Sequence, residues 1–175
     1  MRLSGRTYAV LVAEGVEDLE YWVTVMRLRE EGATVISVGS DTEPHRGKNG
    51  LSVQADAIPF DVEAGELDGL VITGGFAPDK LRRDAAILNL VRAVYSRGLP
   101  VGIICHGGSV AISAGIVGAR ATGSLGIKDD LVLAGAEWVD EPAFRDGQLV
   151  WGRVVADIPA FERELVDAFA EAAED

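Results

Sequence analysis

Cys105 is the residue whose position best suits it for chemistry, and it is the single cysteine of the chain. It ends the apolar run at residues 100–104 and is followed at once by His106, Gly107 and Gly108, so a helix can begin with almost no loop. A buried strand that turns this sharply into a helix forms a nucleophile elbow at the carboxyl ends of the strands. The positive end of the helix would favour the thiolate and make the sulfur a better nucleophile. The alternative is a buried structural cysteine.

A second feature of the same kind is the pair Gly74 and Gly75, which follows the apolar run at residues 70–73. We expect this run to lie beside the strand that precedes Cys105, so the backbone N–H groups of the pair would face the same crevice. Together with the amide of His106, they would supply the donors that stabilise an oxyanion during attack on a carbonyl group. The alternative is an ordinary turn after a strand.

Glu20 is the third candidate, one turn into the first predicted helix. Its side chain could point across the crevice and, when protonated, donate a hydrogen bond to a thiolate. It belongs, however, to an acidic turn that also contains Glu14, Glu17 and Asp18. Charge runs of this kind are usually solvated, so the sequence alone favours a solvated Glu20.

Short β-branched runs alternate with amphipathic stretches, which is typical of a parallel sheet covered by helices on both faces. Four nearly continuous apolar runs predict buried strands, at residues 8–13, 34–38, 70–73 and 100–104. A hairpin is expected around Asn49 and Gly50. No repeat, linker or change of composition divides the chain, so we expect a single α/β domain over residues 1–175.

Four helices are predicted between and after these strands. The first begins at Glu17 and Asp18 and ends at Gly32, the second runs from Pro78 to Arg97, the third covers residues 106–114, and the last follows Asp157. In the first helix, Leu19, Trp22, Val23 and Met26 recur at helical spacing and predict its apolar face. The acidic tail from Glu171 to Asp175 is expected to fray.

The composition limits the kinds of molecule that the protein is expected to bind. The 175 residues carry 28 acidic and 16 basic groups, a formal charge of −12, which repels phosphate backbones and anionic lipids. No nucleic-acid or membrane partner is therefore expected. No stretch approaches the roughly 20 apolar residues of a membrane span, and we expect a cytoplasmic protein whose thiol stays reduced.

The sequence also predicts neither a metal nor a cofactor. One thiol cannot complete a cysteine-rich zinc site, and His45 has no second His or Cys at ligand spacing. Gly74 and Gly75 lack the spacing of a dinucleotide fingerprint, and no phosphate-loop Lys-Ser/Thr follows them.

Six short motifs occur in a fixed order along almost the whole chain. They are EGVEDLE at residues 14–20, GGFAPD at 74–79, ICHG at 104–107, ISAG at 112–115, GIKDD at 126–130 and AEWVD at 136–140. In this order they resemble the DJ-1/PfpI superfamily, and within it the PfpI-like intracellular protease branch. The resemblance implies a flavodoxin-like fold with a doubly wound, mostly parallel sheet.

The resemblance also implies roles for individual residues. Cys105 would be the nucleophile, His106 its partner, and Glu20 the carboxyl that touches the sulfur. Because the side chains of consecutive residues diverge, the family completes its triad with an acidic group from a neighbouring subunit, a position that Asp79 occupies here. The site would then exist only in a homodimer, which in the family builds into hexamers. Aromatic side chains that could anchor such contacts are Tyr21, Trp22 and Trp138.

Several residues near the thiol depart from the family pattern. Ile103 stands where the family has Ala or Ser, Phe76 replaces Arg, and Ser124 falls where some members place Tyr. Further departures are Thr73 for Pro, Gly108-Ser109 for Pro-Gln, and Gly152-Arg153 for Ser-Arg. We expect Phe76, Ile103 and Ser124 to shape the pocket, and Phe76 to deprive an anionic substrate of a cation at the mouth.

The leading functional interpretation is a cysteine-dependent hydrolase or hydratase with a role in stress response. Cys105 would attack a small carbonyl compound or a peptide, the amides of Gly75 and His106 would hold the oxyanion, and His106 or Glu20 would move the proton. Peptidase, glyoxalase and deglycase activities all begin in this way. One alternative is a redox-sensing or chaperone-like stress protein that uses an oxidisable Cys105 without turnover. Another is an inactive scaffold for interactions.

Overall fold

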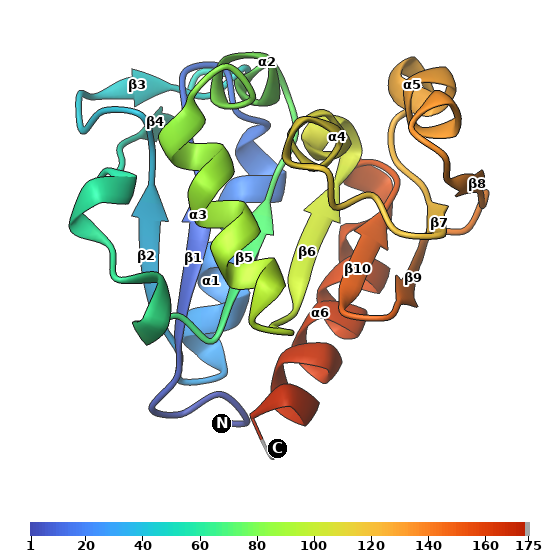
Figure 1. The fold of residues 1–175 in the computed structure, drawn as a ribbon. Helices are drawn as coiled ribbons and strands as arrows, with labels where there is room; N and C mark the ends of the chain where they lie inside the picture. The colour runs from blue at the N-terminus through green and yellow to red at the C-terminus, as the bar shows by residue number, and fades with distance from the viewer. Residues whose placement is uncertain (174–175) are drawn as a thin grey trace.

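A six-stranded sheet forms the centre of the computed structural model, which describes residues 1–173 (Figure 1). The strand order is β2-β1-β5-β6-β10-β9. The strands are β1 (Thr7–Leu11), β2 (Thr34–Val38), β5 (Gly69–Ile72), β6 (Val101–Ile104), β9 (Ala143–Asp146) and β10 (Leu149–Gly152). Neighbours pair in parallel except β9, which runs antiparallel to β10. The predicted α/β class with a mostly parallel sheet is confirmed, and each of the four predicted runs is a strand within two residues of its expected ends.

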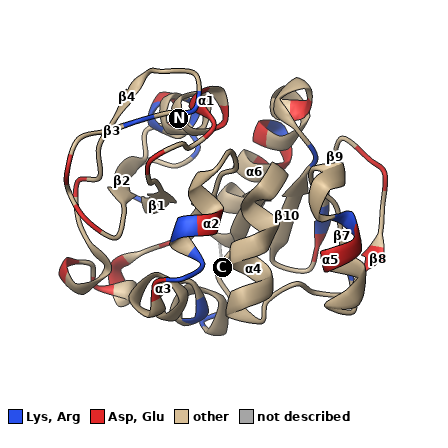
Figure 2. Cartoon of the chain, turned by 90° about the horizontal axis from the view of Figure 1, so that it is seen from above, with Lys and Arg blue, Asp and Glu red and all other residues tan. Residues whose placement is uncertain are grey.

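Helices cover both faces of the sheet, as the view onto the carboxyl ends of the strands shows (Figure 2). On one face lie α1 (Asp18–Glu30) and α6 (Ile158–Ala172); on the other lie α2 (Ala77–Leu81), α3 (Ala85–Ser96) and α4 (Gly108–Ala114). Beyond β10 are β7 (Arg120–Ala121), α5 (Lys128–Leu133) and β8 (Glu137–Trp138). The predicted hairpin consists of β3 (His45–Arg46) and β4 (Ser52–Val53). Short 3-10 turns are η1 (Pro59–Asp61), η2 (Ala64–Glu66), η3 (Cys105–Gly107), η4 (Leu125–Ile127) and η5 (Val155–Asp157).

The order of the strands creates a crevice at their carboxyl ends. The chain passes from β1 to β2 on one side and then returns to place β5 on the other side of β1. In open α/β sheets, such a change of direction leaves space between the connections that leave the two strands. The loops after β1, β5 and β6 therefore meet around one crevice.

The core is aliphatic and continuous across both faces. Every residue of β5 and β6 is buried, as strands covered on two sides require. Gly102 in β6 permits this packing, since a Cβ atom there would lie 2.5 Å from Cδ1 of Leu165 on α6. Burying aliphatic side chains in this way stabilises the fold by about 25 cal/mol for each Å² of apolar surface.

The predicted second helix is divided into two. α2 ends at Leu81, and α3 begins at Ala85 after an N-cap at Asp84, whose carboxylate accepts a hydrogen bond of 2.8 Å from the amide of Ala86. An Asp side chain that bonds to the backbone competes with a continuing helix and starts a new one. The prediction of one helix from Pro78 to Arg97 was therefore wrong, although its apolar face on α3 is buried.

The inward face of α1 also differs from the prediction. Leu19 and Met26 are 49% and 61% exposed, whereas Tyr21, Val25 and Leu28 are buried against the sheet. The Tyr21 hydroxyl forms a 2.7 Å hydrogen bond with the hydroxyl of Ser37 on β2, which helps to select this face. Tyr21 is thus a core residue and not an exposed aromatic anchor, while Trp22 and Trp138 are half-buried.

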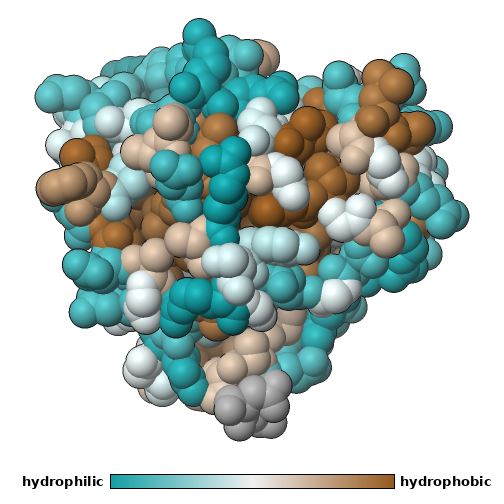
Figure 3. All heavy atoms as spheres, viewed as in Figure 1, coloured by the Kyte–Doolittle hydropathy of each residue, from teal (hydrophilic) through white to brown (hydrophobic). Residues whose placement is uncertain are grey.

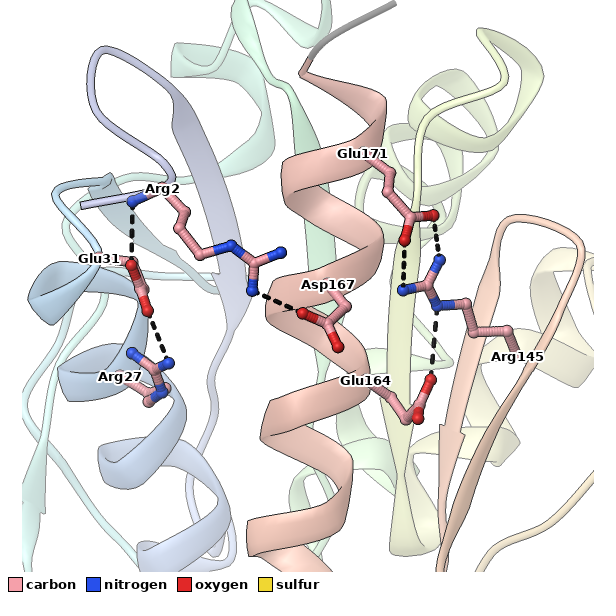
Figure 4. Close-up of polar contacts among 7 residues, drawn as sticks. All are labelled: Arg2, Arg27, Glu31, Arg145, Glu164, Asp167 and Glu171. Carbon is pink, nitrogen blue, oxygen red and sulfur yellow. Dashed lines mark hydrogen bonds and ion pairs between the residues drawn. The ribbon is translucent and has the colours of Figure 1, made fainter.

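The terminal helix forms as predicted, with different contacts at both ends. The carboxylate of Asp157, the expected cap, binds Nε of Arg153 at 2.9 Å instead of capping the helix. Near the other end, Glu171 pairs with Arg145 at 2.5 Å, beside the pair of Arg2 with Asp167 (Figure 4). The fraying predicted from Glu171 is therefore wrong for that residue, and residues 174 and 175 lie outside the described residues.

Apolar side chains reach the surface over α5 and beside α4 (Figure 3). α5 contributes Val132 and Leu133, which are 47% and 86% exposed. Among residues 1–173, no helix is both long and apolar enough to cross a membrane.

A buried polar contact joins α1 to α6. Thr24 on α1 donates a hydrogen bond to Oε1 of Glu162 on α6, and both residues are at most 4% exposed. Oε2 of Glu162 has no hydrogen-bond partner among the described residues. Burial therefore raises the pKa of Glu162 from its ordinary value of 4.5 to about 7, against the opposing effects of Thr24 and Arg27.

We predict that Glu162→Gln stabilises the protein at pH 8 and has a smaller effect at pH 5. Because the pKa is higher in the folded state, stability is greatest below about pH 4.5 and is lost as pH rises through about 7, by up to about 3 kcal/mol. Gln keeps the acceptor for Thr24 and removes the charge. Thermal melts at both pH values test this, with exposed Glu137→Gln as the control. Equal shifts at the two pH values would contradict it.

Candidate functional site

The turn after β6 has the strained geometry of an elbow. Cys105 has φ of 59°, and among the described residues it is the only non-glycine with positive φ. Such a conformation costs about 1–3 kcal/mol and persists only where the surrounding structure imposes it. η3 begins at Cys105 and leads directly into α4, so the helix predicted at residues 106–114 is present, and Gly115 ends it with φ of 75°. The strand therefore presents the sulfur at the crevice.

The two glycines after β5 lie against the elbow. A Cβ atom on Gly74 would lie 2.7 Å from Cβ of Cys105 and 2.8 Å from Oε2 of Glu20. Gly75 has φ of +75°, and its amide and that of His106 lower the pKa of Cys105 and so favour the thiolate. The glycine pair thus allows β5 and β6 to approach closely, with the two N–H groups near the thiol.

Glu20 is fully buried and lies beside the thiol. Its Oε2 accepts a 2.7 Å hydrogen bond from the amide of Gly74, and its carboxyl group is within hydrogen-bonding reach of Cys105. The prediction that Glu20 is solvated was therefore wrong. The sequence could not reveal this, because the turn of α1 that carries Glu20 is covered by loops distant in the chain.

Burial changes the acidity of both groups. It raises the pKa of Glu20 from 4.5 to about 7, although the Gly74 amide and the thiol partly oppose this. Burial and the negative charge of Glu20 raise the pKa of Cys105 from 9.0 to about 12, against the two backbone amides. Burial and the charge of Glu20 therefore outweigh the stabilisation of the thiolate that was expected from the start of the helix. Because the two groups are adjacent, the ionisation of each affects the other, and the carboxyl group is the one whose pKa lies near neutrality.

His106 points away from its neighbour Cys105, toward the segment around Gly126, where an added Cβ atom would lie 3.1 Å from the imidazole Cε1. Burial and then the charge of Lys48 lower the pKa of His106, so the imidazole is neutral at pH 7. Within residues 1–173 its ring has no hydrogen-bond partner.

Asp79 lies on α2 with its side chain 79% exposed, paired with Arg83 at 3.4 Å. One copy of the chain therefore does not join Asp79 to His106, although both line a shared hollow of about 300 Å³.

A cavity of about 350 Å³ lies over the thiol. Its lining contains the predicted Glu20, Gly75, Phe76, Cys105, His106 and Ser124, and also Glu17, Lys48, Val154, Val155 and Ala156, which sequence reasoning missed. Phe76, 64% exposed, forms part of the rim, but Ile103 is fully buried in β6 and does not line the cavity. Ile103 therefore supports the sheet behind the elbow and does not shape the pocket.

Two further carboxylates of the acidic turn, Asp18 and Glu17, are also buried and not solvated, whereas Glu14 is exposed. Asp18, 2% exposed, accepts hydrogen bonds of 2.7 and 2.8 Å from the amides of Asn49 and Leu51 in the β3–β4 hairpin. Glu17, 3% exposed, pairs with Lys48 at 3.3 Å and accepts from the Asn49 side chain. The two carboxylates therefore fold the hairpin back over the site. In residues 1–173, no group of three His, Cys, Asp or Glu side chains could hold a metal ion.

Comparison with known proteins finds a family whose model matches most of the chain. A model of the DJ-1/PfpI family matches residues 6–168. A deglycase of Pyrococcus horikoshii is 41% identical over 157 residues, 89% of this chain and 95% of that protein. Deglycase PfpI of Pyrococcus furiosus is 38% identical over 157 residues, with the same coverage of 89% and 95%.

A solved structure agrees with this assignment. A two-domain protein of Anabaena variabilis, with DJ-1/ThiJ/PfpI-like and ferritin-like domains, superposes with a TM-score of 0.89 at 33% identity. The match covers 93% of this chain and 47% of that one, so the chain spans about half of that protein.

We predict that Gly74→Ala lowers the rate of alkylation of Cys105 by iodoacetamide by at least about tenfold. The added methyl group would force apart Cys105 and Glu20, whose atoms lie under 3.0 Å from the new Cβ position, so the carboxylate could no longer accept the thiol proton. Gly65→Ala is the matched control, because its Cβ atom would meet nothing within 4 Å. Mass spectrometry of the alkylated peptide gives the rate, and circular dichroism verifies the fold. An unchanged rate in folded Gly74→Ala would show that the close approach is not needed.

Proposed function

Because the chain belongs to the DJ-1/PfpI family, we propose that it uses Cys105 as the nucleophile of a PfpI-type enzyme that acts on small carbonyl compounds. The observation that carries this proposal is the buried Glu20 carboxyl, held by the Gly74 amide at 2.7 Å beside the thiol. A carboxyl with a pKa near 7 is suited to accept and return a proton at neutral pH.

The reaction begins with a proton transfer inside the pair. The S–H proton of Cys105 passes to Glu20, and the thiolate adds to the carbonyl carbon of the substrate. A carbon–sulfur bond forms while the π electrons of the carbonyl group move to its oxygen. Glu20 then returns the proton to that oxygen, which leaves a neutral adduct and a carboxylate ready for the next step.

Backbone amides stabilise the charge that develops on the oxygen. The N–H groups of Gly75 and His106 lie near the sulfur, and we expect them to reach an oxygen bonded to the adjacent carbon. Such donors lower the barrier most when they are fixed before the reaction. The positive φ of Gly75 and the elbow at Cys105 fix both of them.

The size of the cavity favours small substrates over peptides. About 350 Å³ lies at the lower end of the range for ligand pockets, and Phe76 closes part of its rim. A peptidase needs an open groove, whereas a dicarbonyl compound or a glycated side chain fits a small pocket. A stress sensor that works by oxidation is less well supported, because the thiolate is the species that oxidises and burial raises the pKa of this thiol.

We predict that turnover of methylglyoxal follows the ionisation of Glu20. Below about pH 7, kcat/KM should fall about tenfold per pH unit, because protonated Glu20 cannot accept the thiol proton. Glu20→Gln should lose at least about 100-fold and show no such pH dependence. Exposed Glu14→Gln is the control, and a fluorogenic peptide assayed in parallel should give little turnover. Full turnover by Cys105→Ala would overturn the mechanism.

The proposal includes a second copy of the chain. Members of the family are generally oligomeric, and Asp79 is exposed beside the hollow that also contains His106. We propose that Asp79 of one subunit binds His106 of another and orients its imidazole. Among residues 1–173, the Asp79 carboxylate pairs only with Arg83, in the turn that follows α2, and such a surface carboxylate is free to exchange partners at little cost.

We predict that mixing two inactive variants restores activity. Cys105→Ala lacks the thiol and Asp79→Asn lacks the carboxylate, but a mixed dimer of two-fold symmetry contains one complete site. After the two variants are unfolded and refolded together, activity should reach about one quarter of the wild-type value, because half of the dimers are mixed. Mixing Cys105→Ala with Glu20→Gln is the control. Cys105 and Glu20 belong to the site of the same subunit, so no mixed dimer contains a complete site and activity should not return. A fully active Asp79→Asn variant would refute the role of Asp79.

A further inference from the structure

Lys48 is the only Lys or Arg side chain in the described lining of the cavity over Cys105. It lies between β3 and β4, and its backbone N–H donates a 2.9 Å hydrogen bond to the carbonyl of Val16, which fixes its position. Its Nζ lies 3.3 Å from Oε2 of Glu17 and 6.0 Å from the centroid of the Phe76 ring. The mouth of the cavity therefore combines a cation with an apolar ring.

The ion pair with Glu17 leaves the ammonium group of Lys48 available to a ligand. An ammonium group has three hydrogen-bond donors, and Glu17 uses one of them at a distance longer than the 2.7–2.9 Å of a strong pair. Glu17 is itself engaged by the side chain of Asn49 and by the amide of Leu19, whose helix it caps. Since the Lys48 side chain is 40% exposed, its remaining donors can meet a ligand in the cavity.

The charge of Lys48 reaches both His106 and Glu20. It adds to the effect of burial in lowering the pKa of His106, and it partly opposes the burial that raises the pKa of Glu20. Elsewhere the chain is strongly acidic, with a formal charge of −12. A single cation at the mouth of a cavity in such a protein would distinguish anionic from neutral compounds that are otherwise alike.

We propose that Lys48 determines specificity by binding the carboxylate of a small anionic carbonyl substrate, of the 2-oxo acid class, so that its carbonyl carbon faces Cys105. This substrate class rests on the proposed function. Phe76 stands where the family has Arg, but the hairpin brings Lys48 to the Phe76 ring, so the mouth still contains a cation. Lys48 supplies the charge, and Phe76 supplies apolar contact for the carbon chain.

The test compares two reagents that differ in charge but have the same leaving group, iodoacetate and iodoacetamide. In both, the thiolate forms a bond to the methylene carbon, iodide leaves with the electron pair, and the thiol proton goes to Glu20. The ratio of the two rate constants, divided by the ratio for free glutathione, measures the preference of the site for an anion. Lys48→Gln should lower this ratio about tenfold, and Lys48→Arg should preserve it.

Two further variants sharpen the test. Glu17→Gln keeps an oxygen to cap α1 but frees the ammonium group, so it should raise the ratio. Lys128→Gln removes the same charge from α5, where the lysine lies over the ring of Trp138, and should leave the ratio unchanged. A ratio that is equal in wild type and Lys48→Gln would overturn the proposal, as would an equal loss in Lys128→Gln.

Measurements of turnover distinguish a failure of this inference from a failure of the proposed function. For glyoxylate, Lys48→Gln should raise KM about tenfold with little change in kcat, whereas KM for neutral methylglyoxal should not change. If wild-type protein turned over neither compound, the proposed function would fail, but the alkylation ratio would still decide whether Lys48 selects anions. A KM for glyoxylate that is unchanged in an active variant would refute the substrate class.

Discussion

The contact on which the site depends is the hydrogen bond from the amide of Gly74 to the buried carboxyl of Glu20, beside the sulfur of Cys105. It brings together the connections that follow β1, β5 and β6. Gly74 must lack a side chain for this contact, and Cys105 must adopt a positive φ. A carboxyl group in an apolar interior would be costly without a partner, so one amide makes its burial tolerable and leaves its pKa near neutrality.

Acidic residues also have a structural role around this contact. Glu17 and Asp18 are buried because the amides of the β3–β4 hairpin and the Lys48 side chain satisfy them. They hold a loop that would otherwise extend into solvent, and that loop provides the cation of the cavity. Carboxylates in the first turn of α1 also complement the positive end of the helix. The same few acids therefore start a helix, order a hairpin and shape the mouth of the site.

Local patterns predicted the parts of the structure that depend on local forces. Continuous apolar runs identified β1, β2, β5 and β6, and the glycines around Cys105 identified the elbow, because these follow from burial on two faces and from backbone freedom. The inward face of α1 could not be predicted from spacing, since its choice depends on Ser37 and Glu162, which are distant in the chain. Burial of Glu20 and the place of Lys48 were missed for the same reason: both depend on which loops meet above the sheet.

Glu20 and Glu162 illustrate what makes a carboxyl group functional. Both are buried, and burial raises the pKa of each to about 7. Glu162 meets Thr24 between two helices and lines a hollow of about 350 Å³, but the described lining of that hollow contains no Cys, Ser or Thr, so Glu162 can only bind or release a proton and thereby change stability. Glu20 lies beside a thiol and a cavity, so its proton can move to a group that forms bonds. A perturbed pKa thus indicates a buried acid. It is the presence of a nucleophile and a space for substrate, placed there by the switch in strand order, that turns the same perturbation into a candidate for catalysis.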